Sequence, residues 1–351
     1  MMKEKIIVLD DTQSRSALTK FNAGSKARSD IDRIFSAYPI YFFGNYNTKK
    51  YISRILFYQR AMHRLKKEDP RSIYIMQYPE YILPPLIKRL YQFASAHRTI
   101  VYIHDLNSLR IGGDNREAIK EEISRLNTFS VIIAHNRFMH QWLTENGCTR
   151  PIVDLNLFDY LAEEPKEKPL RYDIGFAGNL EYEKSKFLYK AMNRNPEVTF
   201  EVFGKGWDKK HVEHDNHHYQ GTKDPDEIVD CFHSRFGLIW DGDTTDTCAG
   251  RYGAYERYNN PHKLSLYMAA GMPAIVWQEA AIADFVKKNG VGIVLHDLND
   301  LHSELAKITP DQYAQMRKNA QAVGDRARAG VFSKTAVRTA VKYLRKEAEH
   351  A

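Results

Sequence analysis

Residues 258–277 read Tyr-Asn-Asn-Pro-His-Lys-Leu-Ser-Leu-Tyr-Met-Ala-Ala-Gly-Met-Pro-Ala-Ile-Val-Trp. They predict a loop, a short helix that ends at a glycine, and a buried strand. Pro261 suits the start of the helix because its missing N–H would be unpaired there, and Gly271 can take the left-handed conformation that ends a helix. Lys263 falls in the first helical turn, where the helix dipole and a compact positive charge both favour a phosphate. The stretch therefore predicts an α/β unit that binds a diphosphate-bearing ligand.

Strand-like and helix-like segments alternate through most of the chain, which is typical of a parallel sheet with helices on both faces. The expected strands are 5–9, 40–43, 72–77, 99–104, 130–134, 172–177, 198–203, 236–240, 274–277 and 292–295. The expected helices are 27–38, 51–66, 83–96, 120–125, 137–146, 185–193, 224–232, the helix that holds Lys263, 282–288 and 334–349.

The alternation breaks near residues 156–168, where a charged, proline-bearing segment is typical of a linker. We therefore predict an α/β fold with two Rossmann-like domains that face each other across a cleft. The N-terminal domain is expected over residues 1–160 and the C-terminal domain over residues 170–333. The tail, residues 334–351, is expected to be a helix that crosses back onto the first domain.

Composition restricts the class of protein. Hydrophobic residues make up 43% of the 351 residues and charged residues 27%, as in ordinary globular domains. We find no run of about 18 uncharged apolar residues that would predict a transmembrane helix, and the N-terminal apolar run is too short for a signal peptide. Three widely spaced cysteines argue against a disulfide framework and a Cys-rich zinc site, and favour a reducing cytoplasm.

The net charge of +7 is compatible with an anionic substrate, with contact to anionic lipids, or with an ordinary solvated surface. No nucleic-acid motif or long basic run accompanies it, so a nucleic-acid partner is not expected. Lys26 and Arg28 are read either as a solvated helix face or as part of a site. The histidine-rich residues 211–218 predict a surface loop, because no glutamate follows His214 as the usual zinc motif requires.

Polar or glycine residues follow nearly every expected strand, which is where open α/β sheets bind ligands. In the N-terminal half they are Asp11, Ser14, His104 and Asp105. In the C-terminal half they are Gly178, Asn179, Lys184, Lys186, Gly204, Asp241 and Asp243. Each has a structural alternative. The glycines can form turns, His104 and Asp105 can end a strand, and the two aspartates resemble a metal pair but favour a loop or a substrate hydroxyl.

Several blocks resemble a known family and occur in its order over nearly the whole chain. They are Ala23 to Arg28; Ile103 to Leu106 with Leu109-Arg110 and Gly112-Gly113; Ala134-His135-Asn136; Ala177 to Leu180; Phe236 to Asp243; and Tyr258 to Lys263 with Ser265 to Tyr267. The chain resembles the GT-B glycosyltransferases, in the branch of the bacterial β-1,6-galactofuranosyltransferases of O-antigen and capsule assembly and the streptococcal adhesin glucosyltransferases.

The resemblance implies a UDP-sugar donor held mainly by the C-terminal domain, with no metal and no cofactor. Lys263 would neutralise the diphosphate, and Gly204 and Gly221 would lie near the uridine. The donor-binding candidates are Gly178, Asn179, Lys184, Lys186, Gly204, Gly221, Asn259, Asn260, Lys263 and Ser265. The N-terminal domain would present the acceptor, with Asp105 or His104 as the base and Asp11 in reserve. The Glu-x7-Glu pattern of many GT-B enzymes is absent, so recognition of the ribose and sugar by that motif is not implied.

We therefore expect transfer of galactofuranose from UDP-galactofuranose to a hydroxyl of a polysaccharide or lipid-linked oligosaccharide, with inversion if the donor is α-linked and the product β. Two alternatives stay open: a UDP-glucose-dependent glucosyltransferase acting on a glycoprotein adhesin, and a non-catalytic nucleotide-sugar-binding scaffold. The expected location is the cytoplasm, with peripheral contact at the inner face of the membrane. A homo-oligomer is left open.

Overall fold

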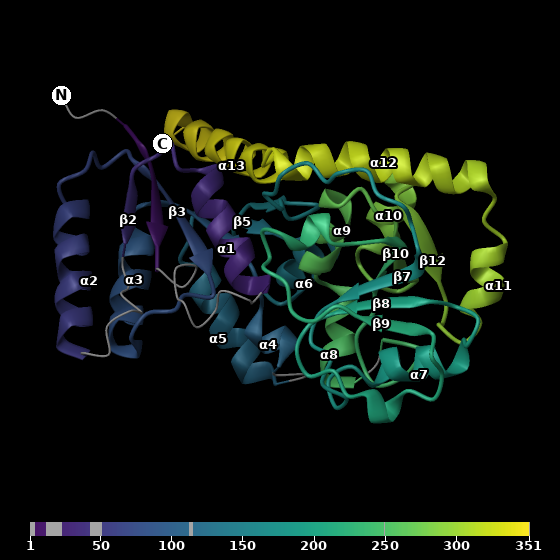
Figure 1. The fold of residues 1–351 in the computed structure, drawn as a ribbon. Coiled ribbons are helices and arrows are strands. Elements are labelled where there is room, and N and C mark those ends of the chain that lie inside the picture. The colour runs from purple at the N-terminus through teal and green to yellow at the C-terminus, as the bar shows by residue number, and fades with distance from the viewer. Residues whose placement is uncertain (1–3, 12–22, 43–50, 112–114, 249, 351) are drawn as a thin grey trace. The chain divides into compact units, whose positions relative to one another are not determined.

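The computed structural model describes residues 4–11, 23–42, 51–111, 115–248 and 250–350 (Figure 1). Contacts within the chain divide it into two compact units. Unit 1 comprises Met1–Asn156 and Val331–Ala351, and unit 2 comprises Leu157–Gly330. Unit 2 begins at Leu157 because residues 157–160 are buried in it, with the Tyr160 ring 5.0 Å from the His262 ring.

The sheet of unit 1 has six parallel strands in the order β2-β1-β3-β4-β5-β6. They are β1 Ile6–Asp10, β2 Ile40–Phe42, β3 Ile73–Tyr78, β4 Arg98–Ile103, β5 Val131–Ala134 and β6 Ile152–Asp154. Strands β1, β3, β4 and β5 are almost continuously apolar and buried, as in a parallel sheet covered on both faces. Because all of these strands pair in parallel, their carboxyl ends lie at one edge of the sheet.

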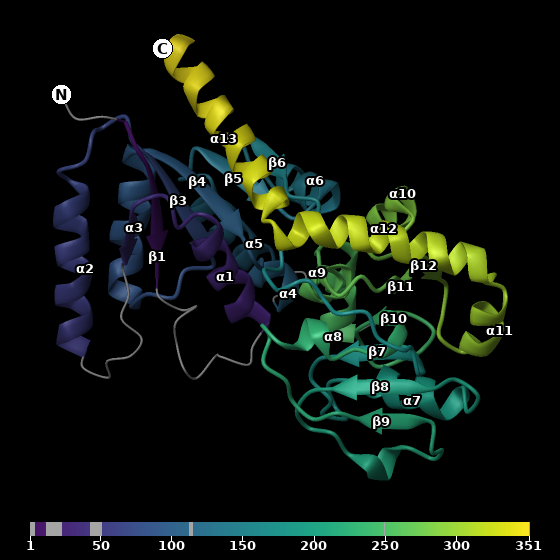
Figure 2. The ribbon, with the colours of Figure 1, turned by 45° about the horizontal axis from the view of Figure 1, so that its top comes forward.

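The helices of unit 1 are α1 Ala23–Ile34, α2 Tyr51–Leu65, α3 Pro84–Ala96, α4 Asn107–Arg110, α5 Arg116–Leu126, α6 Arg137–Glu145 and α13 Val331–His350. The tail is helical, as predicted, and contacts β4, β5, β6 and α1 (Figure 2). Its buried residues Phe332, Ala336, Ala340 and Leu344 recur every four positions, which places one apolar face on the sheet. The Arg98 guanidinium donates to the carbonyl of Leu344 at 2.8 Å.

The sheet of unit 2 is also parallel, in the order β12-β11-β10-β7-β8-β9. Its strands are β7 Tyr172–Ala177, β8 Phe200–Phe203, β9 His217–Tyr219, β10 Ser234–Ile239, β11 Ala274–Trp277 and β12 Gly292–Leu295. Its α-helices are α7 Lys186–Arg194, α8 Gly250–Gly253, α9 His262–Ala269, α10 Ala283–Asn289, α11 Leu301–Ala306 and α12 Pro310–Arg328. The two predicted α/β units are therefore confirmed.

Some expected elements differ from the structure. Residues 224–232 do not form a helix; they contain only the short 3-10 turn η4, Ile228–Asp230. The Asp224 carboxylate accepts from the Asp226 N–H at 3.0 Å, which favours a turn at this point. The histidine-rich stretch is not a loop throughout, because His217–Tyr219 is the edge strand β9, paired with β8. Helix α1 also begins at Ala23, four residues before the predicted start.

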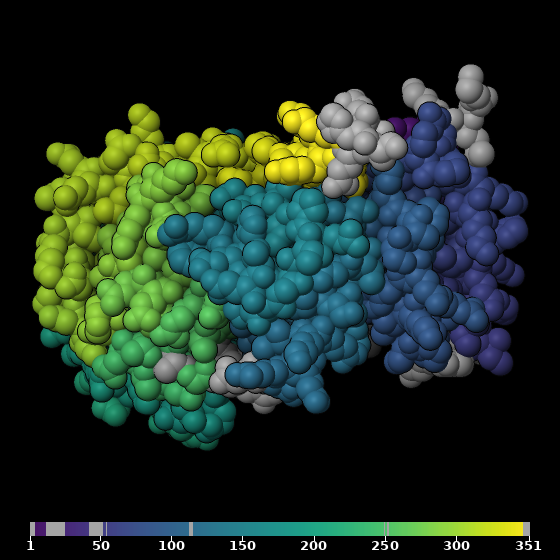
Figure 3. All heavy atoms as spheres, turned by 180° about the vertical axis from the view of Figure 1, so that it is seen from behind, coloured from purple at the N-terminus to yellow at the C-terminus, as the bar shows by residue number. Residues whose placement is uncertain are grey.

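Helix α12 fixes the position of α9 within unit 2. A Thr309–Gln312 capping box starts α12, and the Arg328 guanidinium donates to the Ala269 carbonyl near the end of α9 at 2.6 Å. A Cβ added at Gly324 would lie 2.0 Å from the Met268 carbonyl oxygen. The two helices therefore pack closer than any side chain at position 324 allows. Figure 3 shows the yellow-green atoms of α12 on the outside of the molecule.

We predict that Gly324→Ala lowers the free energy of unfolding by about 1–3 kcal/mol, because the added methyl group meets backbone atoms that cannot rotate away. Urea unfolding followed by tryptophan fluorescence measures this. The exposed substitution Lys318→Ala on the same helix should stay within about 0.5 kcal/mol of the parent chain. Equal stabilities for Gly324→Ala and Lys318→Ala would contradict the close packing.

Candidate functional site

The first candidate site lies where the strands of unit 2 end. The Gly178 N–H donates to the Phe203 carbonyl and the Gly204 N–H to the Gly221 carbonyl, both at 3.0 Å. Gly178, Gly204 and Gly221 therefore lie on neighbouring strand ends. Gly204 has a φ of +145°, and a Cβ there would lie 1.8 Å from the Gly178 carbonyl oxygen. This close approach accounts for glycine at position 204, and the uridine role of Gly204 and Gly221 stays a prediction.

Lys263 lies in the first turn of α9, as predicted. Its ammonium is 4.8 Å from the centre of the Phe176 ring, near the end of β7. A Cβ on Gly178 would lie 3.3 Å from Lys263 Cε, so glycine leaves room for the lysine stem. Pro261 is the N-cap of α9 and makes no side-chain capping bond. The N-terminal N–H groups of α9 thus lie beside a lysine, an arrangement that suits an anion.

Polar atoms are buried at the same helix end. Asn260 is buried, and Ser265 is fully buried inside α9. Within the part of the chain that the structure describes, Asn259 Oδ1 and Ser265 Oγ are buried and have no hydrogen-bond partner. Such orphaned oxygens are rare in folded proteins. Both are closed to solvent here, so the donor-binding role of Asn259 and Ser265 stays a prediction.

Of the two lysines that follow β7, only Lys184 pairs with a residue at the carboxyl edge. Its ammonium lies 3.1 and 3.2 Å from the two carboxylate oxygens of Asp241, which follows β10. Lys186 instead pairs with Glu183 at 2.6 Å. The side-chain oxygen of Asn179 accepts from the Glu181 N–H at 2.7 Å and shapes the turn after β7. Lys184 therefore lies at the carboxyl edge of the sheet, and the donor-binding role of either lysine stays a prediction.

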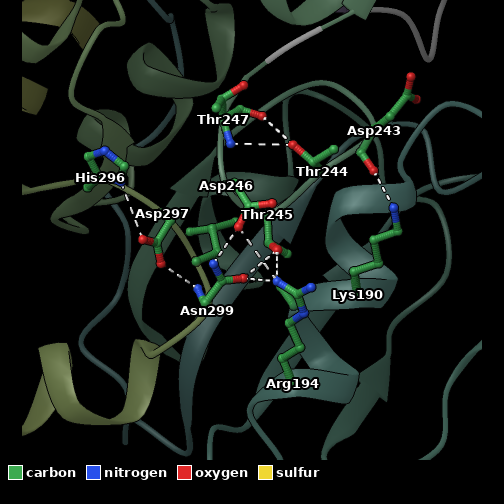
Figure 4. A network of polar contacts seen from close by, with 12 residues as sticks. Lys190, Arg194, Asp243, Thr244, Thr245, Asp246, Thr247, His296, Asp297 and Asn299 are labelled. Atoms are coloured by element: carbon green, nitrogen blue, oxygen red, sulfur yellow. Dashed lines mark hydrogen bonds and ion pairs between the residues drawn. The ribbon is translucent and has the colours of Figure 1, made fainter.

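The loop that begins at Asp241 is anchored by a polar network (Figure 4). Thr245 Oγ1 accepts from the Arg194 guanidinium at 2.6 Å and donates to Asn299 Oδ1 at 2.6 Å. The Lys190 ammonium donates to the Asp243 carbonyl at 2.8 Å. Across the described residues, no three His, Cys, Asp or Glu side chains gather as metal ligands would. Asp241 thus acts as a partner of Lys184 on a loop that this network holds in place.

Glu256 belongs to this site and was not singled out from the sequence. It lies in the 3-10 turn η5, Ala254–Arg257, and is only 4% exposed. Burial raises the pKa of its carboxyl to about 8; the charge of Asp241 raises it further, whereas Lys263 and Lys184 oppose the shift. Four ionisable groups from separate segments therefore interact here. The sequence offered no signal, because Glu256 belongs to no motif and its ionisable neighbours come from other segments.

The second candidate site lies where the strands of unit 1 end. The Asp11 carboxylate accepts from the Arg28 guanidinium at 2.7 Å and from the Tyr81 N–H at 2.8 Å. Lys26 pairs with Asp30 at 2.6 Å, and all four charged side chains of these two pairs are buried. Reading Lys26 and Arg28 as a solvated helix face is therefore wrong, because both point into unit 1 and end on carboxylates.

His104 and Asp105 follow β4 at the same edge. His104 Nε2 lies 2.7 Å from Gln77 Oε1, and the Asp105 carboxylate accepts from Arg110 at 2.8 Å. Tyr81 was not predicted. Burial raises its pKa, the charges of Asp105 and Asp11 raise it further, and those of Arg28 and Arg110 lower it. The phenol therefore lies among these four charges, two of which were predicted as catalytic.

Glu122 holds the backbone next to this pair and was also missed. Its buried carboxylate accepts from the Asn107 N–H at 3.0 Å and the Ser108 N–H at 2.9 Å, at the start of α4.

Two further predicted positions, Ser14 and the Gly112-Gly113 pair, lie outside the described residues.

Comparison with known proteins identifies the family. Residues 15–157 match the model of the glucosyltransferase 3-like N-terminal domain, and residues 174–340 match that of the C-terminal domain. The β-1,6-galactofuranosyltransferase WbbI of Escherichia coli is 32% identical over 241 residues, which are 67% of this chain and 68% of the relative. The chain belongs to the glucosyltransferase 3-like family of glycosyltransferases. Glucosyltransferase 3 of Streptococcus parasanguinis is 22% identical over 242 residues, 68% of each chain.

The fold comparison agrees with this family of glycosyltransferases. Sucrose-phosphate synthase from Thermosynechococcus elongatus superimposes with a TM-score of 0.65 at 11% identity, covering 99% of this chain and 100% of that one. The predicted GT-B fold is confirmed. The glycosyltransferase brings Gly178, Lys184 and Lys263 together in unit 2 and Asp11, His104 and Asp105 to one edge of unit 1. Their individual roles stay predictions.

We predict that Glu256→Gln removes a pH dependence of stability. Glu256 keeps its proton in the folded state up to about pH 8, whereas the unfolded chain loses it near the ordinary glutamate value. Folding stability therefore falls as pH rises between these values, by up to about 1.4 kcal/mol per pH unit. Urea unfolding at pH 5, 6, 7 and 8 should show a shallower decline for Glu256→Gln than for the parent. The exposed Glu227→Gln should follow the parent, and identical slopes for all three would refute this reading.

Proposed function

We propose that the chain transfers a sugar from a UDP-sugar to a hydroxyl of a polysaccharide or lipid-linked oligosaccharide in cell-surface glycan synthesis. Galactofuranose is the favoured sugar, because the galactofuranosyltransferase relative is 32% identical and the glucosyltransferase relative 22%. The observation that carries the proposal is Lys263 in the first turn of α9, beside the end of β7.

The charges of the unit 2 site favour a diphosphate. Lys184 and Lys263 supply two positive charges against one negative charge from Asp241. Glu256 adds none near neutral pH, because burial keeps it protonated up to about pH 8. The site thus has a net positive charge, beside helical N–H groups that no side chain caps.

In the proposed reaction, the acceptor hydroxyl forms a bond to the anomeric carbon while the bond from that carbon to the β-phosphate oxygen breaks. Negative charge grows on the departing UDP. Lys263 and the N-terminus of α9 stabilise that charge electrostatically, so we propose no metal and no cofactor. Unit 1 supplies the base, His104 or Asp105. An α-linked donor and a β-linked product would make the reaction inverting.

The second candidate function is UDP-glucose-dependent glucosyl transfer to a glycoprotein. The word glucosyltransferase in the descriptions of both matched family models supports the glucosyl part of this candidate. Parallel assays with UDP-galactofuranose and UDP-glucose distinguish the two. A non-catalytic scaffold would bind UDP without turnover of either donor.

We propose that the protein acts in the cytoplasm at the membrane face where lipid-linked acceptors lie. Among the described residues, no helix combines the length and apolar character that crossing a membrane requires.

We predict that Lys263→Ala lowers the transfer rate on the order of 100-fold, because the leaving group loses its nearest positive charge. Release of UDP from the donor in the presence of a lipid-linked oligosaccharide measures this. Lys184→Ala should weaken donor binding. Lys186→Ala should have a smaller effect, because Lys186 pairs with the exposed Glu183 and not with a residue at the carboxyl edge of the sheet. Lys210→Ala, on an exposed lysine of the same unit, is the matched control. Undiminished transfer by Lys263→Ala would overturn the site.

We also predict that UDP raises the melting temperature of the parent chain and that ADP, GDP and NAD do not. A ligand that binds only the folded state stabilises that state by an amount that grows with the ratio of its concentration to its Kd. A thermal-shift series measures this, and Lys263→Ala should lose most of the shift. Equal stabilisation by ADP and UDP would contradict a uridine-selective site.

A further inference from the structure

Helix α2 exposes two aliphatic side chains that the core of unit 1 does not use. Ile52 is 71% exposed and Leu56 48%, and they lie one helical turn apart. We call them the apolar pair. The opposite side of the helix is buried: Tyr58 and Leu65 are each 1% exposed, and the Tyr58 hydroxyl donates to the Leu86 carbonyl of α3 at 3.4 Å. Figures 1 and 2 show α2 at the margin of unit 1.

Positive side chains continue the same face of the helix. Residues 51–67 contain five lysine or arginine residues and no aspartate or glutamate. Four of the five are exposed, and we call them the basic cluster: Arg60, Arg64, Lys66 and Lys67. Arg60 and Arg64 follow Leu56 at intervals of four residues, so the basic cluster extends the row of side chains that the apolar pair begins.

The charge of the basic cluster is not compensated. Among the residues that the structure describes, none of its four side chains forms a hydrogen bond or an ion pair. The two carboxylates that follow it in the chain are engaged elsewhere: Glu68 pairs with the Lys5 ammonium at 2.8 Å, and Asp69 pairs with the Arg71 guanidinium at 2.9 Å. This face of α2 therefore presents positive charge beside exposed apolar surface.

That combination fits the surface of an anionic lipid bilayer. An interfacial helix places aliphatic side chains at the boundary between headgroups and acyl chains, and its lysines and arginines attract the anionic headgroups. A second copy of the same face would bring like charges together. A nucleic acid would meet the charges but leave the apolar pair in water, and the row offers no aromatic side chain on which a base could stack.

We propose that this outer face of α2 docks unit 1 on an anionic lipid bilayer. The apolar pair enters the headgroup boundary, and the basic cluster contacts the lipid phosphates. The inference rests on the proposed function, because a lipid-linked oligosaccharide presents its sugar at such a surface. Two aliphatic side chains and four charges make a reversible contact, which added salt weakens.

Co-sedimentation of the full chain with vesicles tests the docking surface. We expect binding to vesicles of one part phosphatidylglycerol to two parts phosphatidylcholine, and much weaker binding to pure phosphatidylcholine. Inorganic phosphate at the same phosphate concentration should not displace the protein, because it offers no apolar boundary. Equal binding to both kinds of vesicle, binding to neither, or full displacement by inorganic phosphate would each overturn the proposal.

Paired substitutions locate the binding on α2. Arg60→Gln/Lys67→Gln should lower the vesicle affinity by about 25-fold, at about fivefold for each positive charge lost. Ile52→Ser/Leu56→Ser should lower it by roughly tenfold and keep its salt dependence, because only apolar burial is lost. Melting temperatures show that each variant remains folded.

The matched control removes two exposed lysines from α10 of unit 2, as Lys287→Gln/Lys288→Gln. It changes the net charge by the same amount and should bind vesicles within about twofold of the parent chain, because exposed charges act over about 10 Å. A loss equal to that of Arg60→Gln/Lys67→Gln would assign the binding to net charge alone and overturn the role of α2.

Single-stranded RNA distinguishes a nucleic-acid surface from a lipid surface. We expect poly-uridylate to bind weakly and to leave vesicle binding in place. Tight poly-uridylate binding that Arg60→Gln/Lys67→Gln removes and Ile52→Ser/Leu56→Ser keeps, without vesicle binding, would overturn the proposal.

The same variants separate this inference from the function on which it rests. With the better of the two UDP-sugars, Ile52→Ser/Leu56→Ser should slow transfer to a lipid-linked oligosaccharide in vesicles, but not to the same oligosaccharide free of lipid. Vesicle binding that both α2 variants lose, without turnover of either UDP-sugar by the parent chain, would contradict the proposed function and support the docking surface. Turnover without vesicle binding would leave the function standing and overturn the docking surface.

Discussion

Parallel strand pairing is the constraint on which both candidate sites depend. When all strands of a sheet run the same way, the residues that follow them must meet at one edge, however far apart they are in the chain. In unit 2 this brings the turn after β7 and the turn after β8 so close that the backbone at position 204 has no room for a side chain. The positive charges at this edge come from Lys263 on α9 and from Lys184, which precedes α7. The same constraint in unit 1 brings Asp11, Gln77 and His104 together from three strands.

Burial of charge shapes both edges in different ways. In unit 1 the buried charges are paired, as Asp11 is with Arg28 and Lys26 with Asp30. Such pairs are costly to break, because removing either partner leaves an uncompensated buried charge. In unit 2, Glu256 instead remains protonated near neutral pH. Unit 1 therefore keeps its buried charges in pairs. In unit 2, burial and the charges of Asp241, Lys263 and Lys184 together set the protonation of Glu256.

Apolar patterns and chain breakers were sufficient to predict most of the fold. Strands β7, β11 and β12 have the predicted bounds, because buried apolar runs between polar or glycine residues define them. Lys263 was predicted because a helix start and a lysine are both local features. Tyr81, Glu122 and Glu256 were missed, because their surroundings come from distant segments and a polar residue in a sequence is read as solvent-facing. Strand β9 was missed for a related reason: an exposed edge strand of His-His-Tyr carries no apolar alternation.

The C-terminal helix has a consequence for how the protein is made. Unit 2 is a single continuous segment, Leu157–Gly330, whereas unit 1 needs both Met1–Asn156 and the last helix, Val331–Ala351. A chain that emerges from the ribosome N-terminus first therefore presents most of unit 1 early, but α13 can cover β4 and β5 only after all of unit 2 has been made. The whole of unit 2 is therefore made before α13, and the apolar face of the unit 1 sheet stays uncovered until that helix follows.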